Sequence, residues 1–156
     1  MADVRLLEEA FDPGAALGSF SALPDAGGIV SFLGQVRGGG GDAGSVEAGS
    51  VEALELQHYA PLTLPAMQAL AERALSRWVL GGLLVWHRVG VMTPGQPIVL
   101  VAAAARHRRD AFEAVDYIMD HLKSDSWFWK RELRDGQWHW IEPRDQDVAD
   151  HARWGD

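Results

Sequence analysis

Two lysines, Lys123 and Lys130, are the residues in this sequence best suited to chemistry. The chain has 14 lysine and arginine residues in total, and all the others are arginine. Arginine can supply surface charge, but it cannot replace a compact amine that must lose a proton, attack a carbonyl or donate at close range. The two lysines, seven residues apart, are therefore candidate catalytic amines. The alternative is that they are two ordinary surface lysines.

Half of the cationic side chains lie in one part of the sequence, residues 106 to 134, which holds seven of the 14. The whole chain has a formal net charge of −8, so it lacks the broad basic surface that nucleic-acid binding needs. A basic segment in an acidic protein indicates a small anionic ligand instead.

The first of these cations form the run Arg106-His107-Arg108-Arg109, just where a helix is predicted to begin. Free N–H groups at a helix N-terminus and arginine side chains both match phosphate oxygens, so this run is a candidate anion site. A solvated surface cluster is the alternative.

Several classes of chemistry are excluded by what the sequence lacks. It has no cysteine, so disulfides, thiolate ligands and a cysteine nucleophile are ruled out, and any reacting sulfur must come from another molecule. Its six histidines lack the close pair spacings of a metal site, so we expect no metal and no cofactor. The acidic N-terminus and the short apolar runs predict neither a signal peptide nor a membrane span, which favours a cytoplasmic protein.

The length of 156 residues with 47% hydrophobic content predicts one domain, 1–156, of the α+β class. A variable N-terminal segment (1–24) and a flexible glycine-rich loop (38–50), in which Gly-Ser-Val-Glu-Ala occurs twice, are expected outside the regular elements. Hydrophobic periodicity and turn residues predict the rest. The predicted strands are 28–37, 51–59, 83–89 and 98–105; the helices run from 63–65 to about 80, over 108–123 and over 145–153; a hairpin, 127–133 with 138–142, turns at Asp135-Gly136.

Several short motifs occur in order between about residues 25 and 154. They are Gly34-Gln35-Val36-Arg37, Leu54-x-Leu-x-His58-Tyr59, His87-Arg88-Val89-Gly90, His107-Arg108, Ala111-Phe112-Glu113-Ala114, Lys123, Trp129-Lys130-Arg131-Glu132 and Ile141-Glu142-Pro143-Arg144. Together they resemble the large, catalytic subunit of molybdopterin synthase. Trp127, where the family commonly has proline, and Asp125 beside Lys123 depart from its pattern.

The resemblance implies an α/β-hammerhead-type fold and a homodimer with a small sulfur-carrier subunit at each end, a heterotetramer. The carrier's C-terminal Gly-Gly thiocarboxylate would enter the active site. Sulfur would be transferred twice to cyclic pyranopterin monophosphate, giving the dithiolene of molybdopterin in molybdenum cofactor biosynthesis. No nucleic acid or membrane is implied.

The resemblance also implies roles for individual residues. Lys123 would be the essential catalytic amine, with Lys130 beside it, and Arg144 would reach across the dimer. The implied substrate-binding positions are Arg37, His107, Arg108, Lys123, Lys130, Arg131, Glu132 and Arg144, and the implied pocket-lining positions are Phe32, Gln35, Val36 and Met119.

Two other functions remain open from the residues alone. The basic run and the lysines would also suit a non-catalytic protein that binds a phosphorylated metabolite or acts as a scaffold. A desolvated lysine would suit a lyase that forms a Schiff base. The tryptophans of the predicted hairpin are expected to pack across its strands, with a stacking platform for a flat heterocycle as the alternative.

Overall fold

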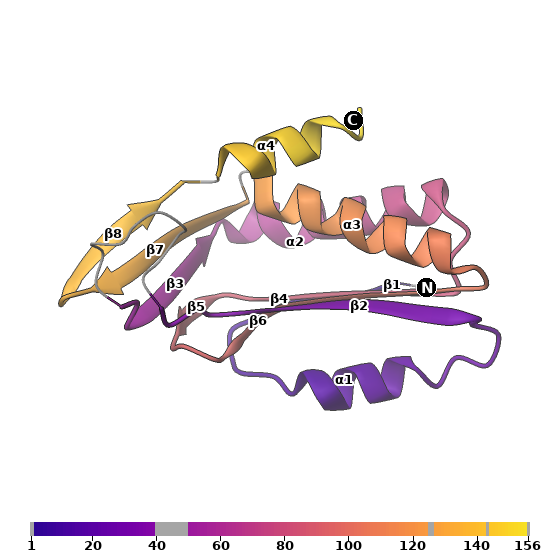
Figure 1. Ribbon diagram of the computed structural model, residues 1–156, viewed down its shortest axis with the longest axis horizontal. Helices are drawn as coiled ribbons and strands as arrows, with labels where there is room; N and C mark the ends of the chain where they lie inside the picture. The colour runs from indigo at the N-terminus through magenta and orange to yellow at the C-terminus, as the bar shows by residue number, and fades with distance from the viewer. Residues whose placement is uncertain (1, 40–49, 125–126, 143, 156) are drawn as a thin grey trace.

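Two four-stranded sheets form the frame of the molecule, and helices cover them (Figure 1). The computed structural model describes residues 2–39, 50–124, 127–142 and 144–155, so most of the predicted loop at 38–50 lies outside the described residues. The elements in this part of the chain are β1 (Ala2–Leu7), α1 (Pro13–Phe20), β2 (Gly28–Gln35), β3 (Ala53–His58), α2 (Ala60–Arg77), β4 (Gly82–Arg88), β5 (Gly90–Met92), β6 (Pro97–Ala105), α3 (Arg108–Ser124), β7 (Phe128–Arg134), β8 (Gln137–Ile141) and α4 (Asp145–Ala152).

The first sheet has the strand order β1-β4-β6-β2. Strand β6 is buried from Ile98 to Ala105 and lies between β4 and β2, so the predicted central strand is confirmed. Its nearly continuous apolar sequence fits a strand that is covered on both faces. Strand β2 forms one edge of this sheet, antiparallel to β6, and β1 forms the other edge, parallel to β4.

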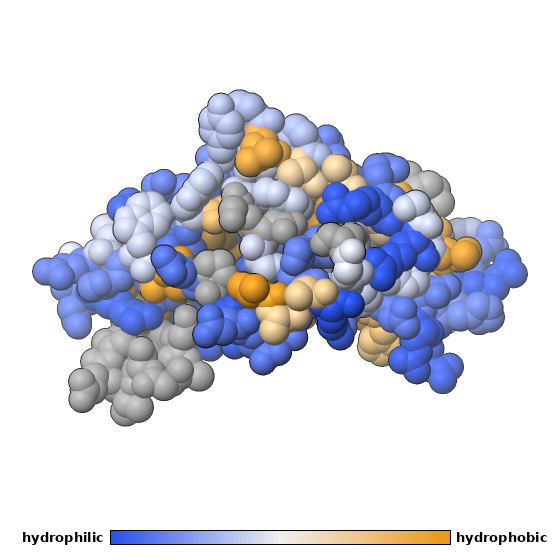
Figure 2. Space-filling view, turned by 90° about the horizontal axis from the view of Figure 1, so that it is seen from above, coloured by the Kyte–Doolittle hydropathy of each residue, from blue (hydrophilic) through white to orange (hydrophobic). Residues whose placement is uncertain are grey.

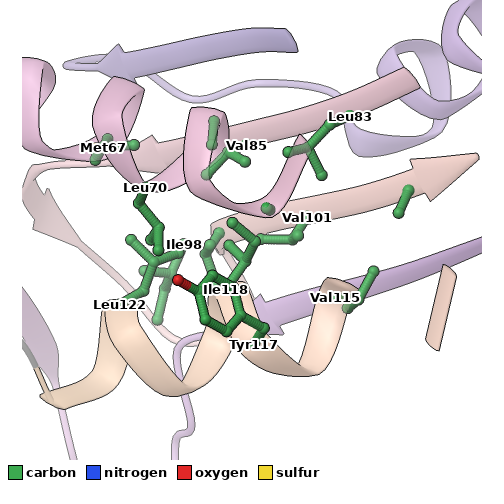
Figure 3. Packing of buried hydrophobic residues seen from close by; sticks show 14 of the residues in the cluster. Met67, Leu70, Leu83, Val85, Ile98, Val101, Val115, Tyr117, Ile118 and Leu122 are labelled. Carbon is green, nitrogen blue, oxygen red and sulfur yellow. The ribbon is translucent and has the colours of Figure 1, made fainter. Parts of the chain in front are cut away.

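Helices α2 and α3 cover one face of the first sheet, and α1 lies on the opposite face (Figure 1). The buried side of α3 follows the helical spacing of Ala111, Ala114, Val115, Ile118 and Leu122. Figure 3 shows side chains of α2, α3 and the first sheet meeting in one core cluster. This packing fixes the direction of α3, and therefore the position of each of its ends.

The second sheet, in the order β5-β3-β7-β8, lies at the end of the molecule where α3 finishes (Figure 1). The β7–β8 hairpin turns at Asp135 (φ 51°) and Gly136 (φ 75°), both in the left-handed region, as the Asp-Gly pair predicts. Successive residues of β7 point to opposite faces of the sheet. Phe128, Lys130 and Glu132 therefore share one face.

The N-terminal region differs most from the expectation. Residues that were predicted only as a variable segment form β1 and α1, with Asp12 accepting a hydrogen bond from the Ala15 amide (3.1 Å) and Pro13 in the first turn. Helix α2 begins at Ala60, earlier than predicted, because Pro61 rather than Pro65 occupies the first turn. Within the described residues, no helix is both long and apolar enough to span a membrane.

Candidate active site

The two lysines lie on either side of the short connection between α3 and β7. Lys123 is in the last turn of α3, and Lys130 is the third residue of β7. The connection is held at its far end by Thr63 of α2, which is fully buried and donates a hydrogen bond from Oγ1 to the carbonyl of Trp127 (3.0 Å). The fold therefore places both amines at the end of the molecule where the two sheets meet.

Four residues, Lys130, Asp147, Arg144 and Arg37, act electrostatically on Lys123. Solvent reaches its side chain, yet the surrounding protein limits hydration of the ammonium, and this is the largest cause of a lowered pKa. The positive charges of Lys130, Arg144 and Arg37 lower the pKa of Lys123 further, whereas the negative charge of Asp147 raises it. A lysine in such surroundings loses its proton more readily than an ordinary surface lysine.

Lys130 faces a buried carboxylate. Glu132, with 4% of its surface exposed, lies 3.8 Å from the Lys130 amine and also accepts a hydrogen bond from Arg134. All three side chains are on the same face of β7, two residues apart. The two neighbouring cations offset the cost of burying the Glu132 charge. In turn, the position of Glu132 holds the Lys130 amine on this face.

An aromatic and imidazole pair adjoins the lysines. The ring of His87, at the end of β4, stacks on Phe128 of β7, with ring centroids 4.0 Å apart and planes inclined by 18°. Burial and the charge of Lys123 lower the pKa of His87 to about 3, although its hydrogen bond with the Arg88 carbonyl opposes this. His87 is therefore uncharged at neutral pH.

The C-terminal helix α4 packs along α3 and supplies further charges. Arg144 precedes α4 and donates to Asp147 (3.1 Å), which faces inward. Beyond the helix, Trp154 donates from Nε1 to Asp120 of α3 (2.6 Å) and packs edge-on against Trp78 and Tyr117. This aromatic cluster holds α4 over the Lys123 end of α3.

The predicted phosphate-binding residues lie at the opposite end of α3. His107 and Arg108 are exposed at its start. With a rise of about 1.5 Å per residue, Arg108 and Lys123 are about 22 Å apart along the axis. One copy of the chain does not bring these two groups together.

A hollow lies between these ends, on the outer side of α3 and β2. Its volume is about 410 Å³, and Phe32 and Met119 are among its lining residues, together with Phe112 and Arg109. Both aromatic rings are half exposed, Phe32 at 43% and Phe112 at 56%. Seen from the side of α3 and α4, apolar residues otherwise reach the surface as separate patches among hydrophilic ones (Figure 2).

The sequence and the fold are similar to those of known proteins. A family model described as "MoaE protein" matches residues 6–125. This chain belongs to the MoaE family. A relative in Caulobacter vibrioides, named molybdopterin synthase catalytic subunit, is 41% identical over 152 residues, which cover 97% of this chain and 96% of the relative.

Solved structures of the MoaE family have the same fold. The molybdopterin biosynthesis MoaE protein of Burkholderia ambifaria superposes with a TM-score of 0.79 at 35% identity, over 100% of this chain and 99% of that one. A Helicobacter pylori structure, described as a protein–protein complex of subunits 1 and 2 of molybdopterin-converting factor, gives a TM-score of 0.72 at 19% identity. It covers 90% of this chain and 91% of that one, and it supports the fold.

The remaining predicted site residues are distributed over both faces of the second sheet and its surroundings. Arg131 is on the face of β7 opposite to Lys130, where it binds Glu55 (2.5 Å) and stacks over Trp138 (4.4 Å). Within one copy, it does not share a face with Lys130. Gln35 is exposed at the end of β2, and Val36 is buried, with its amide bonded to the Gln96 carbonyl (3.0 Å).

Three residues around the two lysines had no predicted role: His87, Phe128 and Asp147. Period-two alternation in β4 places His87 on the same face as Leu83 and Val85, so a histidine among core positions was a signal available in the sequence. No sequence pattern marked Asp147, because only the packing of α4 on α3 brings this residue near Lys123.

Proposed function

We propose that this chain is the catalytic subunit of a molybdopterin synthase that acts in the cytoplasm. It transfers sulfur from the C-terminal thiocarboxylate of a carrier subunit to cyclic pyranopterin monophosphate, twice, to form the dithiolene. Its membership of the MoaE family and relatives named for this activity support the proposal. The observation that carries it is the lowered pKa of Lys123 among Arg37, Lys130 and Arg144, in a chain without cysteine.

The surroundings of Lys123 suit acyl sulfur chemistry. The sulfur atom arrives on the carrier, so the protein needs groups that orient the thioacid carbonyl and move protons while the carbon–sulfur bond of the carrier breaks. An amine with a lowered pKa gives up its proton more readily than an ordinary lysine, and in its neutral form it can also attack the carbonyl transiently. Lys130 adds positive charge near the thioacid carbonyl, where negative charge develops during the reaction. Glu132 holds the Lys130 side chain in place.

A second copy of the chain completes the site. The basic start of α3 is too far from Lys123 within one copy, but a two-fold axis beside α3 would place His107 and Arg108 of one copy near Lys123 of the other. The face that such a dimer would cover contains the hollow with Phe32, Phe112 and Met119 and the open edge of β2. An apolar hollow on an uncharged edge strand is typical of an interface.

The second subunit is the sulfur carrier. The Helicobacter pylori relative is described as a complex of two subunits, which supports a two-component enzyme here. The carrier's extended Gly-Gly tail must reach Lys123, which is accessible at its exposed position on the end of α3. Two carriers on a homodimer give the heterotetramer.

The decisive experiment replaces Lys123. Lys123→Ala should abolish product formation with a thiocarboxylated carrier while the protein remains folded and still binds the carrier, because the proton-exchanging amine is lost. Arg5→Ala, on the far edge of the first sheet, is the matched control for loss of a single cation. Near-normal turnover by Lys123→Ala would remove Lys123 from this role, and binding of the pterin phosphate without any sulfur transfer by the unmodified protein would indicate a scaffold.

The sharing of the site between copies has its own test. Chains with Lys123→Ala and chains with Arg108→Ala are coexpressed with different tags, and the mixed dimer is purified through both tags. At a substrate concentration well below the wild-type Kd, the Lys123→Ala homodimer should be inactive and the Arg108→Ala homodimer should be about 10- to 100-fold less active than wild type. The mixed dimer should regain about half of the wild-type activity, because one of its two sites then has both residues intact. A mixed dimer as inactive as its parents would contradict the shared site.

A further inference from the structure

The contact between His87 and Phe128 joins the two sheets close to both lysines. His87 belongs to β4 of the first sheet, and Phe128 is the first residue of β7 in the second sheet. Phe128 shares its face of β7 with Lys130 and follows Lys123 by five residues. This single ring contact therefore connects the strand that carries Lys130 to the sheet on which the Lys123 helix packs.

His87 is held firmly on its own strand. Only 6% of its surface is exposed, and the flanking strands pair with it at Leu6 and Val99. Its Nδ1–H donates to the Arg88 carbonyl at 2.9 Å, which leaves Nε2 without a proton. The ring thus has one orientation and one tautomer, and it presents a flat face to Phe128.

We propose that His87 is a positioning residue for the Lys123–Lys130 pair: its uncharged ring, stacked on Phe128, fixes β7 beside the end of α3 and limits the hydration of the amines there. The part of this inference that concerns sulfur transfer rests on the function proposed above. The part that concerns the Lys123 amine does not.

The charges around the site explain why a neutral ring is needed. Lys123 is surrounded by Lys130 of β7, Arg37 beyond β2 and Arg144 before α4, and Asp147 of α4 is the one negative charge that acts on it appreciably within the described residues. A charged side chain at position 87 would add a fourth cation or draw an ammonium into an ion pair. An imidazole that stays neutral keeps its stacking and its backbone hydrogen bond without changing the charge balance.

The chain's two lysines allow a direct measurement. Reductive methylation with ¹³C-formaldehyde labels Lys123, Lys130 and the N-terminal amine, and NMR titration follows each amine separately, with Lys123→Arg assigning its signal. In His87→Ala, the pKa of Lys123 should rise toward the ordinary lysine value, because water replaces the ring. In His87→Phe, which keeps a flat ring, it should stay close to the wild-type value.

The control is His139→Ala, which removes an exposed histidine from β8 and should leave the Lys123 titration unchanged. If His87→Ala does not fold, His87→Leu is the second variant: leucine fills the volume but cannot stack on Phe128, so β7 is held less firmly and water should reach the Lys123 amine more easily. An unchanged Lys123 pKa in the variants without a ring, or a change in His87→Phe as large as theirs, would overturn the inference.

Enzyme kinetics provide the second readout. His87→Ala should lower kcat about 100-fold, the size expected when reacting groups move by about 1 Å, while KM for the pterin substrate changes little. His87→Phe should recover most of the lost kcat. If the wild-type protein shows no sulfur transfer at all, the proposed function fails, but the NMR titration still decides the role of His87.

Discussion

The two ends of α3 both carry positive charge, in different surroundings. At the start, Arg106, His107, Arg108 and Arg109 are all exposed. At the end, Lys123 is crowded by the second sheet, α4 and the segment after β2, and its pKa is lowered. Arginine side chains keep their charge and suit binding of an anion, whereas the Lys123 amine, which solvent reaches but which protein crowds, gives up its proton more readily and suits chemistry. In the proposed dimer, one helix would deliver a binding group to the site of one copy and a reacting group to the site of the other.

The largest expected effect comes from changing the chemistry of the crowded end without changing its charge. Lys123→Arg should reduce kcat by about 100-fold or more, because the guanidinium keeps the positive charge but cannot exchange a proton at neutral pH. Single-turnover assays with thiocarboxylated carrier measure the step directly. Lys130→Arg is the matched variant, and a smaller loss there would assign the proton-exchanging role to Lys123. If Lys123→Arg retained wild-type kcat, the distinction between the two ends would fail.

At the exposed end, the expected effect is on binding. Arg108→Ala should weaken binding of the pterin phosphate by about 10- to 100-fold, the size of one lost charge-assisted hydrogen bond, with a smaller effect on kcat. Calorimetry with the substrate measures the change in Kd. Arg106→Ala, in the same basic run, controls for the general electrostatic attraction. Equal effects of the two variants would mean that the cluster acts only through its net charge.

A stability test addresses the hydrogen bond that holds the connection between α3 and β7, next to Lys123. Thr63→Val removes the hydrogen bond to the Trp127 carbonyl while keeping the shape of the side chain, so the free energy of unfolding should fall by about 1–3 kcal/mol. Ser76→Ala removes an exposed hydrogen bond to the Arg73 carbonyl and should change stability by less than about 0.5 kcal/mol. Urea unfolding compares the two. Equal losses would show that the Thr63–Trp127 bond has no special role.

The smallest expected effect is a shift in pH dependence. Asp147 favours the charged form of Lys123, so Asp147→Asn should lower the pKa of Lys123 further and move the acidic limb of the pH–rate profile to lower pH. The lowered pKa of Lys123 also affects stability. A lysine whose pKa is lower in the folded than in the unfolded protein reduces the free energy of unfolding at any pH where the lysine is protonated in both states. This penalty disappears as the pH rises from the folded pKa to the unfolded pKa. Asp145→Asn, in the same turn of α4, is the control, and a shift to higher pH in Asp147→Asn would contradict this account.

The sequence predicted well those parts of the fold that depend on local pattern. The apolar spacing of α3 gave its bounds to within one residue, and Asp135-Gly136 placed the hairpin turn. Strand β1 was missed because it depends on parallel pairing with β4, about eighty residues away. Strand β5 was missed because only its pairing with Leu54, Glu55 and Leu56 of β3 makes three residues a strand.

The candidate site was predictable by residue type but not by arrangement. The scarcity of lysine pointed to Lys123 and Lys130, whereas three other charges that act on Lys123, those of Arg37, Arg144 and Asp147, come from segments farther away in sequence. Arg131 illustrates a rule that was available: adjacent residues on a strand face opposite sides, so Lys130 and Arg131 cannot both point into one pocket of the same copy. The stack of His87 on Phe128 needed the structure, because it joins two sheets.

The open edge of β2 affects how the monomer behaves before it assembles. From Gly28 to Gln35 this strand contains no charged residue and no proline, the features that usually protect an edge from pairing with foreign strands. A newly made copy that has not met its partner would therefore offer a template for aggregation. Substitutions that weaken the proposed dimer should produce insoluble protein rather than a stable monomer.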